Sequence, residues 1–230
     1  SIIIGLILWL VFGMNPMTAM QTGSAITGGN SSGQQNLDQQ TADRDQKFAS
    51  VVLKDTEEVW GQIFSENNMQ YQQPKLVLFN GMLRSGCGNA SSATGPFYCP
   101  ADESVYMDMS FFGEMQQKFG AKVTEFTIAY VMAHEIGHHV QTLLGTTQQV
   151  DKLRRSGQYS EAEMNRVSVA TELQADFYAG LWAKQTNNRE NFLEPGDIES
   201  AMEAAAAVGD DNIQKRSAGY VNQEAFTHGS

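Results

Sequence analysis

The sequence predicts an α+β fold in which a small β-sheet is followed mostly by helices. Two runs of strand-forming residues, 74–79 and 104–109, lie in the first half of the chain, and apolar residues at helical spacing dominate the second half. The chain has 230 residues, of which 41% are hydrophobic. This length and composition suffice for one sizeable core, so we expect one main domain over residues 38–230.

Residues 1–14 form an uncharged apolar run that is typical of a membrane-spanning helix. At about 1.5 Å per residue the run crosses roughly 20 Å of a hydrocarbon core about 30 Å thick, which indicates a truncated transmembrane helix. A signal-peptide core and a buried helix are the alternatives. Residues 15–37 are rich in Gly, Ser, Gln, Asn and Thr, and they predict a flexible linker that lets the domain stand off the membrane.

The remaining elements follow from hydrophobic periodicity and turn residues. Apolar residues from 38 to about 64 recur at helical spacing among charged ones and predict a long amphipathic helix. The two strands come next, and a short helix is expected near 111–119. Thr124 opens a helix that runs into the histidines. Two more helices are expected, at 160–185 and at 197–208, with Asp197 as the N-cap of the second.

Two cysteines, Cys87 and Cys99, are separated by small and turn-forming residues. The chain can therefore fold back and pair the sulfurs, and a disulfide that closes so short a loop contributes about 3 kcal/mol in the chain-entropy model. Unpaired cytosolic thiols or half of a metal site are the alternatives, but no second cysteine pair completes such a site. With a membrane anchor upstream, a disulfide favours an extracytoplasmic domain, periplasmic or extracellular.

The charge balance excludes one class of partner. Fifteen Lys and Arg residues stand against 26 Asp and Glu residues, for a formal net charge of -11. This charge repels phosphate backbones, so we do not expect nucleic acid as a partner.

The segment HEIGH, His134–His138, carries the chemistry that we expect of this chain. Two histidines four residues apart project from one face of a helix and can bind one Zn2+ ion, and Glu135 can take a proton from the attacking water and pass it to the leaving amine. Two helical histidines can also be a satisfied pair in a polar core. The flanking apolar pattern nevertheless provides the helix that the motif needs, and the segment favours a zinc peptidase with a zincin-like fold that acts on a peptide or protein.

A catalytic zinc site also needs a third protein ligand. Gln141 and Leu144 occupy the positions at which metzincins carry a glycine and a histidine, which excludes that subclass. Glu172, on a later helix, is the better candidate. Asp176 follows it by four residues and so lies on the same face, where it can accept the outer N–H of a ligating histidine.

Small residues on the same helix allow it to approach the histidine helix closely enough for Glu172 to reach the metal; they are Ala175, Ala179 and Gly180. The alternative is that Glu172 is a solvated carboxylate and that Glu161 or Glu163 is the ligand.

Several segments together resemble the bacterial predicted neutral zinc metallopeptidases, from the apolar run to the last residue. They are HEIGHHVQ at 134–141, ELQAD at 172–176, GPFYCP at 95–100 with VYMD at 105–108, GDD at 209–211 and THGS at 227–230. Members are similar to gluzincins in their ligand set and typically carry an N-terminal membrane helix. The resemblance therefore implies a membrane-anchored, gluzincin-like peptidase, which agrees with a single-pass protein of the cell membrane.

Three further features carry weaker expectations. His228 could donate a hydrogen bond to the oxyanion of the tetrahedral intermediate, with Tyr220 and Arg216 as less favoured donors and a surface histidine as the alternative. His139 points about 100° away from its neighbouring ligand, so we expect it behind the ligands or at the surface. The strand at 105–109 is either an edge strand that pairs with an extended peptide or an interior strand.

Two rival functions use the same residues. The first is a metal-stabilised binding or scaffold module at the membrane surface without useful turnover, and the second is a zinc hydrolase that acts on a non-peptide amide. The complete set of ligands and base argues against the first, because a degenerate enzyme often loses a residue such as Glu135.

Overall fold

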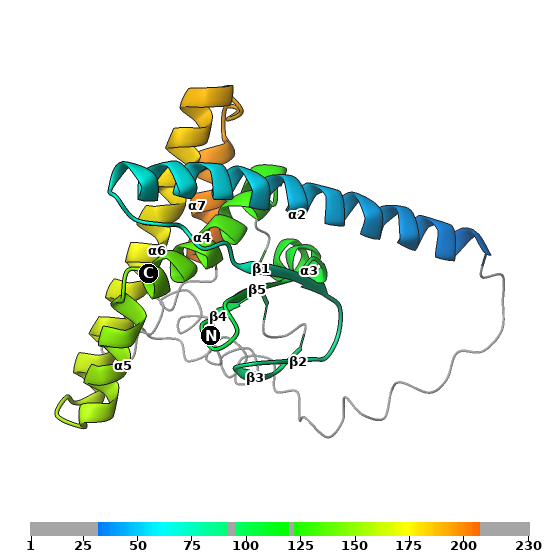
Figure 1. Cartoon of the computed structure of the whole chain (residues 1–230). Coiled ribbons are helices and arrows are strands. Elements are labelled where there is room, and N and C mark those ends of the chain that lie inside the picture. Colours follow the sequence, from blue (N-terminus) through cyan, green and yellow to red (C-terminus); the bar gives the residue numbers. More distant parts are fainter. Residues whose placement is uncertain (1–31, 92–94, 120–121, 208–230) are drawn as a thin grey trace, which may run out of the picture.

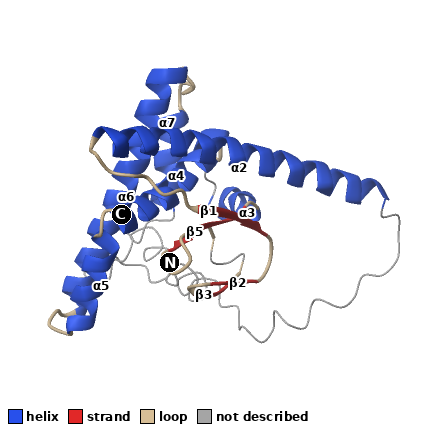
Figure 2. Cartoon of the chain, viewed as in Figure 1, coloured by secondary structure: helices blue, strands red, loops and turns tan. Residues whose placement is uncertain are grey.

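The computed structural model describes residues 32–91, 95–119 and 122–207, and over this part the chain is a mixed α+β fold dominated by helices (Figures 1 and 2). A small sheet lies to one side of the helices. The described elements, in chain order, are α2 (Ser32–Glu66), β1 (Lys75–Phe79), β2 (Leu83–Ser85), β3 (Gly88–Ala90), β4 (Phe97–Cys99), β5 (Ser104–Asp108), α3 (Ser110–Phe119), α4 (Glu125–Leu143), α5 (Thr146–Ser156), α6 (Glu161–Glu190) and α7 (Asp197–Ala207).

The long helix α2 confirms the amphipathic helix expected from residue 38 and lies across α4 and α6 (Figure 1). It begins at Ser32, inside the range expected as linker. No glycine or proline follows Gly33 for many residues, and each further helical residue adds one hydrogen bond at little cost once a helix is nucleated. The expected transmembrane helix at 1–14 and the rest of the expected linker lie outside the described residues.

The main core forms where α2, α4, α6 and β5 meet. Trp60, Met107, Ile136 and Trp182 contribute large buried side chains from these four elements. Burial of this apolar surface is the main force that holds the helices against the sheet. In the part of the chain that the structure describes, no helix combines the length and the apolarity needed to cross a membrane.

The main sheet has three strands in the order β1-β5-β4, with β1 parallel and β4 antiparallel to β5. The strand β5 is therefore central and buried along its whole length, so the edge-strand interpretation of residues 105–109 is wrong and the interior-strand alternative is correct. The three-residue strands β2, β3 and β4 were not predicted from the sequence, because so short a run shows no alternation of apolar and polar residues.

The cysteine pair is bonded, as the sequence predicted: Cys87 and Cys99 form a disulfide that joins the β2-β3 hairpin to β4. The Asp102 carboxylate supports the same junction. It accepts hydrogen bonds from the Gly86 N–H and from the Tyr106 hydroxyl, each at 2.7 Å. The hairpin is thus fastened to the sheet by one covalent link and two polar contacts.

Capping residues explain where the site-bearing helices begin. Thr124 and Ser160 are the N-caps of α4 and α6, and each forms a capping box with the residue three positions on. Asp197 is the first residue of α7 instead of its cap, and its carboxylate accepts the Glu194 N–H at 2.9 Å. Helix α5 was not expected; its sequence is strongly polar, and none of its residues is buried.

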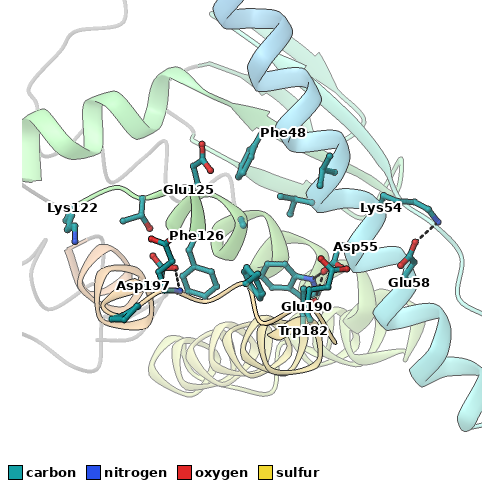
Figure 3. Close-up of a pocket in the computed structure, with 18 residues that line it drawn as sticks. Phe48, Lys54, Asp55, Glu58, Lys122, Glu125, Phe126, Trp182, Glu190 and Asp197 are labelled. Atoms are coloured by element: carbon teal, nitrogen blue, oxygen red, sulfur yellow. Dashed lines mark hydrogen bonds and ion pairs between the residues drawn. The ribbon is translucent and has the colours of Figure 1, made fainter. Parts of the chain in front are cut away.

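A groove of about 620 Å³ lies between α2, the first half of α4 and the end of α6, and aromatic rings and charged side chains of both signs line it (Figure 3). Asp55 of α2 lies at this groove. Its carboxylate accepts hydrogen bonds from Trp182 Nε1, at 2.6 Å, and from the Thr186 hydroxyl, and it pairs with Arg189. These contacts fasten α6 to α2.

Candidate metal centre

The register of α4 places the two histidines of the HEIGH segment on one side of the helix. Ala133, Ile136 and Val140 are fully buried and face the core. The same helix therefore presents His134 and His138 away from that face, toward α6, with side chains 18% and 14% exposed. The helical spacing predicted from the sequence is what brings the two rings side by side.

Close packing of α4 on α6 depends on Gly137. A Cβ at this position would lie 2.9 Å from the Ala175 carbonyl oxygen, so only glycine allows the two backbones to approach this far. Ala175 and Ala179 are fully buried at the same contact, as the sequence anticipated for small residues on this helix. Gly180 is exposed and takes no part in it.

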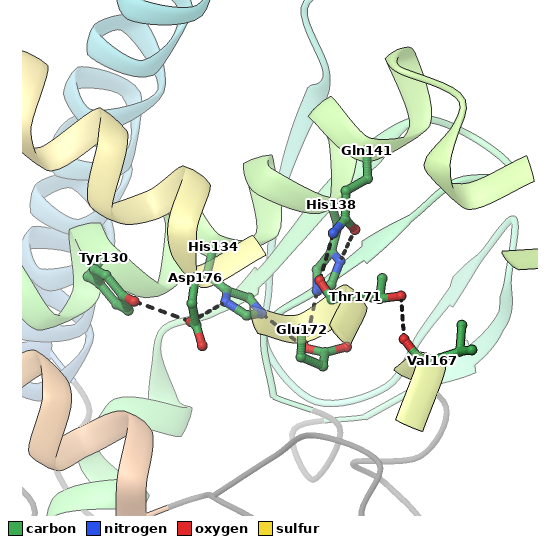
Figure 4. A network of polar contacts seen from close by, with 8 residues as sticks. All are labelled: Tyr130, His134, His138, Gln141, Val167, Thr171, Glu172 and Asp176. Carbon is green, nitrogen blue, oxygen red and sulfur yellow. Dashed lines mark hydrogen bonds and ion pairs between the residues drawn. The ribbon is translucent and has the colours of Figure 1, made fainter. Parts of the chain in front are cut away.

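This packing brings Glu172 to the two histidines (Figure 4). Its Oε2 atom lies 3.2 Å from His134 Nε2 and 3.4 Å from His138 Nε2. One ligand atom from each of the three residues lies within 4.8 Å of the other two. The structure thus gathers the three residues that the sequence nominated as metal ligands.

The charges of these groups are strongly coupled. Burial lowers the pKa of His134, but hydrogen bonds to Asp176 and Glu172 outweigh it and raise the pKa well above its ordinary value. Burial raises the pKa of Glu172, but the neighbouring His138 and His134 hold it well below its ordinary value. The carboxylates around His134 therefore favour a positive charge at this place, either a proton on the ring or a bound cation that takes its place.

Each histidine has a further partner on its outer nitrogen. Asp176 Oδ1 lies 2.8 Å from His134 Nδ1, where the sequence predicted it, and also accepts a hydrogen bond from the Tyr130 hydroxyl at 3.2 Å. Gln141 Oε1 lies 2.9 Å from His138 Nδ1. The roles of Tyr130 and Gln141 were not predicted from the sequence. Tyr130 nevertheless stands four residues before His134, and Gln141 three residues after His138, which are the spacings of one helical face.

Glu135, the expected base, is 6% exposed and lies on α4 between the two histidines in sequence. Its Oε2 atom is buried and has no hydrogen-bond partner among the described residues. A buried carboxylate oxygen without a partner is costly, and such atoms are expected where function requires them. The atom is free to accept a proton or a hydrogen bond from a molecule that enters the site.

The donor set fits zinc. Two imidazole nitrogens and one carboxylate oxygen are the ligands of a three-residue catalytic zinc site, which leaves a fourth position open. The alternative ligand Glu163 is used elsewhere, because its carboxylate accepts the N–H and the hydroxyl of Ser160 at the start of α6. Glu161, in the same first turn, precedes Glu172 by eleven residues, about 16 Å along the helix.

His139 is fully buried behind the ligands instead of at the surface. Its Nε2–H donates to the Gln72 carbonyl oxygen at 2.6 Å, so its Nδ1 accepts the Tyr98 hydroxyl at 3.0 Å. Burial lowers the pKa of His139, which keeps the ring neutral. The residue thus joins α4 to β4. The expected oxyanion donor His228 and its substitutes Tyr220 and Arg216 lie outside the described residues.

Comparison with known proteins agrees with this donor set. The sequence profile of the family described as "Putative neutral zinc metallopeptidase" matches residues 1–230. The chain belongs to this family. It is 50% identical over 184 residues to the uncharacterized protein YpfJ of Escherichia coli K12, a match that covers 80% of this chain and 63% of the relative. It is 46% identical over 169 residues to the uncharacterized protein Rv2575 of Mycobacterium tuberculosis H37Rv, covering 70% of this chain and 55% of the relative.

The match thus spans less than two thirds of either relative. No solved structure matches the chain. Family membership supports zinc as the metal. His134, His138 and Glu172, which meet between α4 and α6, are a group of side chains that could hold such an ion.

Proposed function

We propose that the protein is a membrane-anchored zinc-dependent peptidase in which His134, His138 and Glu172 bind the metal and Glu135 is the general base. The convergence of the three ligand atoms beside a buried carboxylate is the observation that carries this proposal. The family description supports the same chemistry.

A zinc ion held by these residues would act as a Lewis acid, which would polarise the scissile carbonyl and make water a better nucleophile. Glu135 takes the proton of the attacking water and delivers it to the leaving nitrogen as the C–N bond breaks. Asp176 accepts a hydrogen bond from the Nδ1–H of His134 and so directs the Nε2 lone pair of that ring to the ligand position. His228 is proposed as the donor to the oxyanion.

The architecture of the whole protein is part of the proposal. A zincin-like fold is supported by the small sheet beside the helix that carries the histidines and by the glutamate on a later helix. We propose residues 1–14 as the membrane anchor and 38–230 as the peptidase domain, with the part of 15–37 that precedes α2 as the tether between them. The Cys87–Cys99 disulfide supports a location outside the cytoplasm, where such bonds persist.

The test is the Glu135→Gln variant of the full-length, zinc-loaded protein. It should keep one zinc per chain by elemental analysis and lose at least about 100-fold in the cleavage of a mixed peptide library, because the amide cannot take the proton. Glu203→Gln, an exposed position on α7, is the matched control and should cleave like the parent. Cleavage by Glu135→Gln at the parent rate would refute the mechanism. Failure of the zinc-loaded parent to cleave any peptide would favour the binding module.

A further inference from the structure

Gln141 connects two of the three proposed zinc ligands. It lies on α4 three residues after His138, and it is 1% exposed although its side chain is polar. Its amide makes two contacts at once: the oxygen lies 2.9 Å from His138 Nδ1, and the nitrogen lies 2.6 Å from the backbone carbonyl oxygen of Thr171 (Figure 4). Thr171 immediately precedes Glu172 on α6.

These contacts fix the direction of the amide. A backbone carbonyl oxygen only accepts hydrogen bonds, so the amide NH2 must face Thr171 and the amide oxygen must face His138. The oxygen in turn only accepts, so the proton of a neutral His138 ring is held on Nδ1. The lone pair of that ring is then on Nε2, the atom that lies 3.4 Å from Glu172 Oε2.

The two histidines are therefore oriented by different chemistry. His134 donates to a carboxylate, Asp176, which the Tyr130 hydroxyl also contacts. His138 donates to a neutral amide that is itself anchored to the helix of the third ligand. A buried amide with both ends satisfied has one orientation, whereas an exposed one rotates.

We propose that Gln141 is a positioning residue for the metal centre: it selects the tautomer of His138 and holds that ring in register with Glu172. This proposal rests on the zinc site proposed above. A merely structural glutamine would stabilise the contact between α4 and α6 without affecting metal binding by the folded protein, and the experiment separates the two roles.

Methionine and glutamate are nearly equal in size to glutamine, and substitution of Gln141 by each of them removes different contacts. Gln141→Met removes both contacts. Gln141→Glu keeps an oxygen that accepts from His138 but removes the donor to Thr171. Gln149→Met makes the same chemical change at an exposed position on α5 and is the matched control. Zinc affinity is measured on the full-length chain by competition with a chelator, below the melting temperature found for each variant by circular dichroism.

We expect Gln141→Met to bind zinc about 10- to 100-fold more weakly than the parent, the range typical for loss of a partner behind a metal ligand. Gln141→Glu should bind zinc at least about tenfold more tightly than Gln141→Met, because a carboxylate also accepts a hydrogen bond from the Nδ1–H of His138. The visible spectrum of the cobalt-substituted protein should shift in Gln141→Met and match the parent in Gln149→Met.

Parent-like zinc affinity in Gln141→Met, with only a lower melting temperature, would overturn the proposal and leave a structural role. Equal losses in the Met and Glu variants would overturn the tautomer argument, since the two differ in the acceptor offered to His138. A parent that binds no zinc would instead overturn the proposed function, and with it the role of Gln141.

Discussion

Replacement of Gly137 by alanine tests whether the contact between α4 and α6 sets the geometry of the metal centre. The new Cβ would lie 2.9 Å from the Ala175 carbonyl oxygen and 3.1 Å from the Ala175 Cα. Both neighbours are backbone atoms, which cannot rotate away as a side chain would. Since an ordinary contact begins near 3.4 Å, the two helices must separate by about 0.5 Å at this point. His134 and His138 lie on one of them and Glu172 on the other.

Two energies oppose each other in this variant. Overpacking a close contact costs about 1–3 kcal/mol, whereas alanine in place of glycine favours a helix by about 1 kcal/mol. The free energy of unfolding should therefore fall by no more than about 2 kcal/mol, and the protein should still fold. Functional sites tolerate displacements of only about 0.5 Å, so we expect zinc affinity to fall by a factor of about 10 or more.

The assay combines urea unfolding of the metal-free protein with chelator competition for zinc. Gly180→Ala is the matched control, because a Cβ there meets nothing within 4 Å and the position is exposed on α6. This control should gain up to about 1 kcal/mol and bind zinc like the parent. If Gly137→Ala instead matched Gly180→Ala in both stability and zinc affinity, the close approach of the helices would not control the site.

Two further predictions concern stability. Asp55→Ala should lower the free energy of unfolding by about 2–4 kcal/mol in urea titrations, because the Trp182 and Thr186 donors lose their acceptor. Asp55→Asn should recover part of this loss. A change within about 0.5 kcal/mol for Asp55→Ala would contradict the role of Asp55 in holding α6 to α2. For Asp102, burial raises the pKa, but hydrogen bonds from Gly86 and Tyr106 outweigh burial and lower the pKa. This carboxylate therefore stabilises the fold at any pH above its unfolded pKa of about 4. The stabilisation is lost as the pH falls through the folded pKa of Asp102. The stability difference between parent and Asp102→Asn should thus shrink from pH 7 to pH 3, and a difference that does not change with pH would contradict the argument.

The sequence predicted the elements that local rules specify. Strands β1 and β5 and helices α2, α3, α4, α6 and α7 all lie where periodicity and capping residues placed them, although α2 begins six residues before its expected start and α6 ends five residues after its expected end. The three short strands were missed because three residues are too few to show an alternation. Helix α5 was missed because its sequence is strongly polar and contributes no buried residue to the core. The central position of β5 was equally inaccessible, since a buried edge strand and a buried interior strand have the same composition.

By itself the sequence placed two histidines and Glu135 of the candidate centre within one helical segment, and it predicted that Cys87 pairs with Cys99. Their spacing along one helix settles that part, because helical geometry depends only on neighbours along the chain. Only the tertiary structure decided that Glu172 meets those histidines and that Gln141 contacts both helices. Both contacts depend on how α4 and α6 pack, and the two helices are far apart in the sequence. Their close packing is possible because Gly137 has no Cβ.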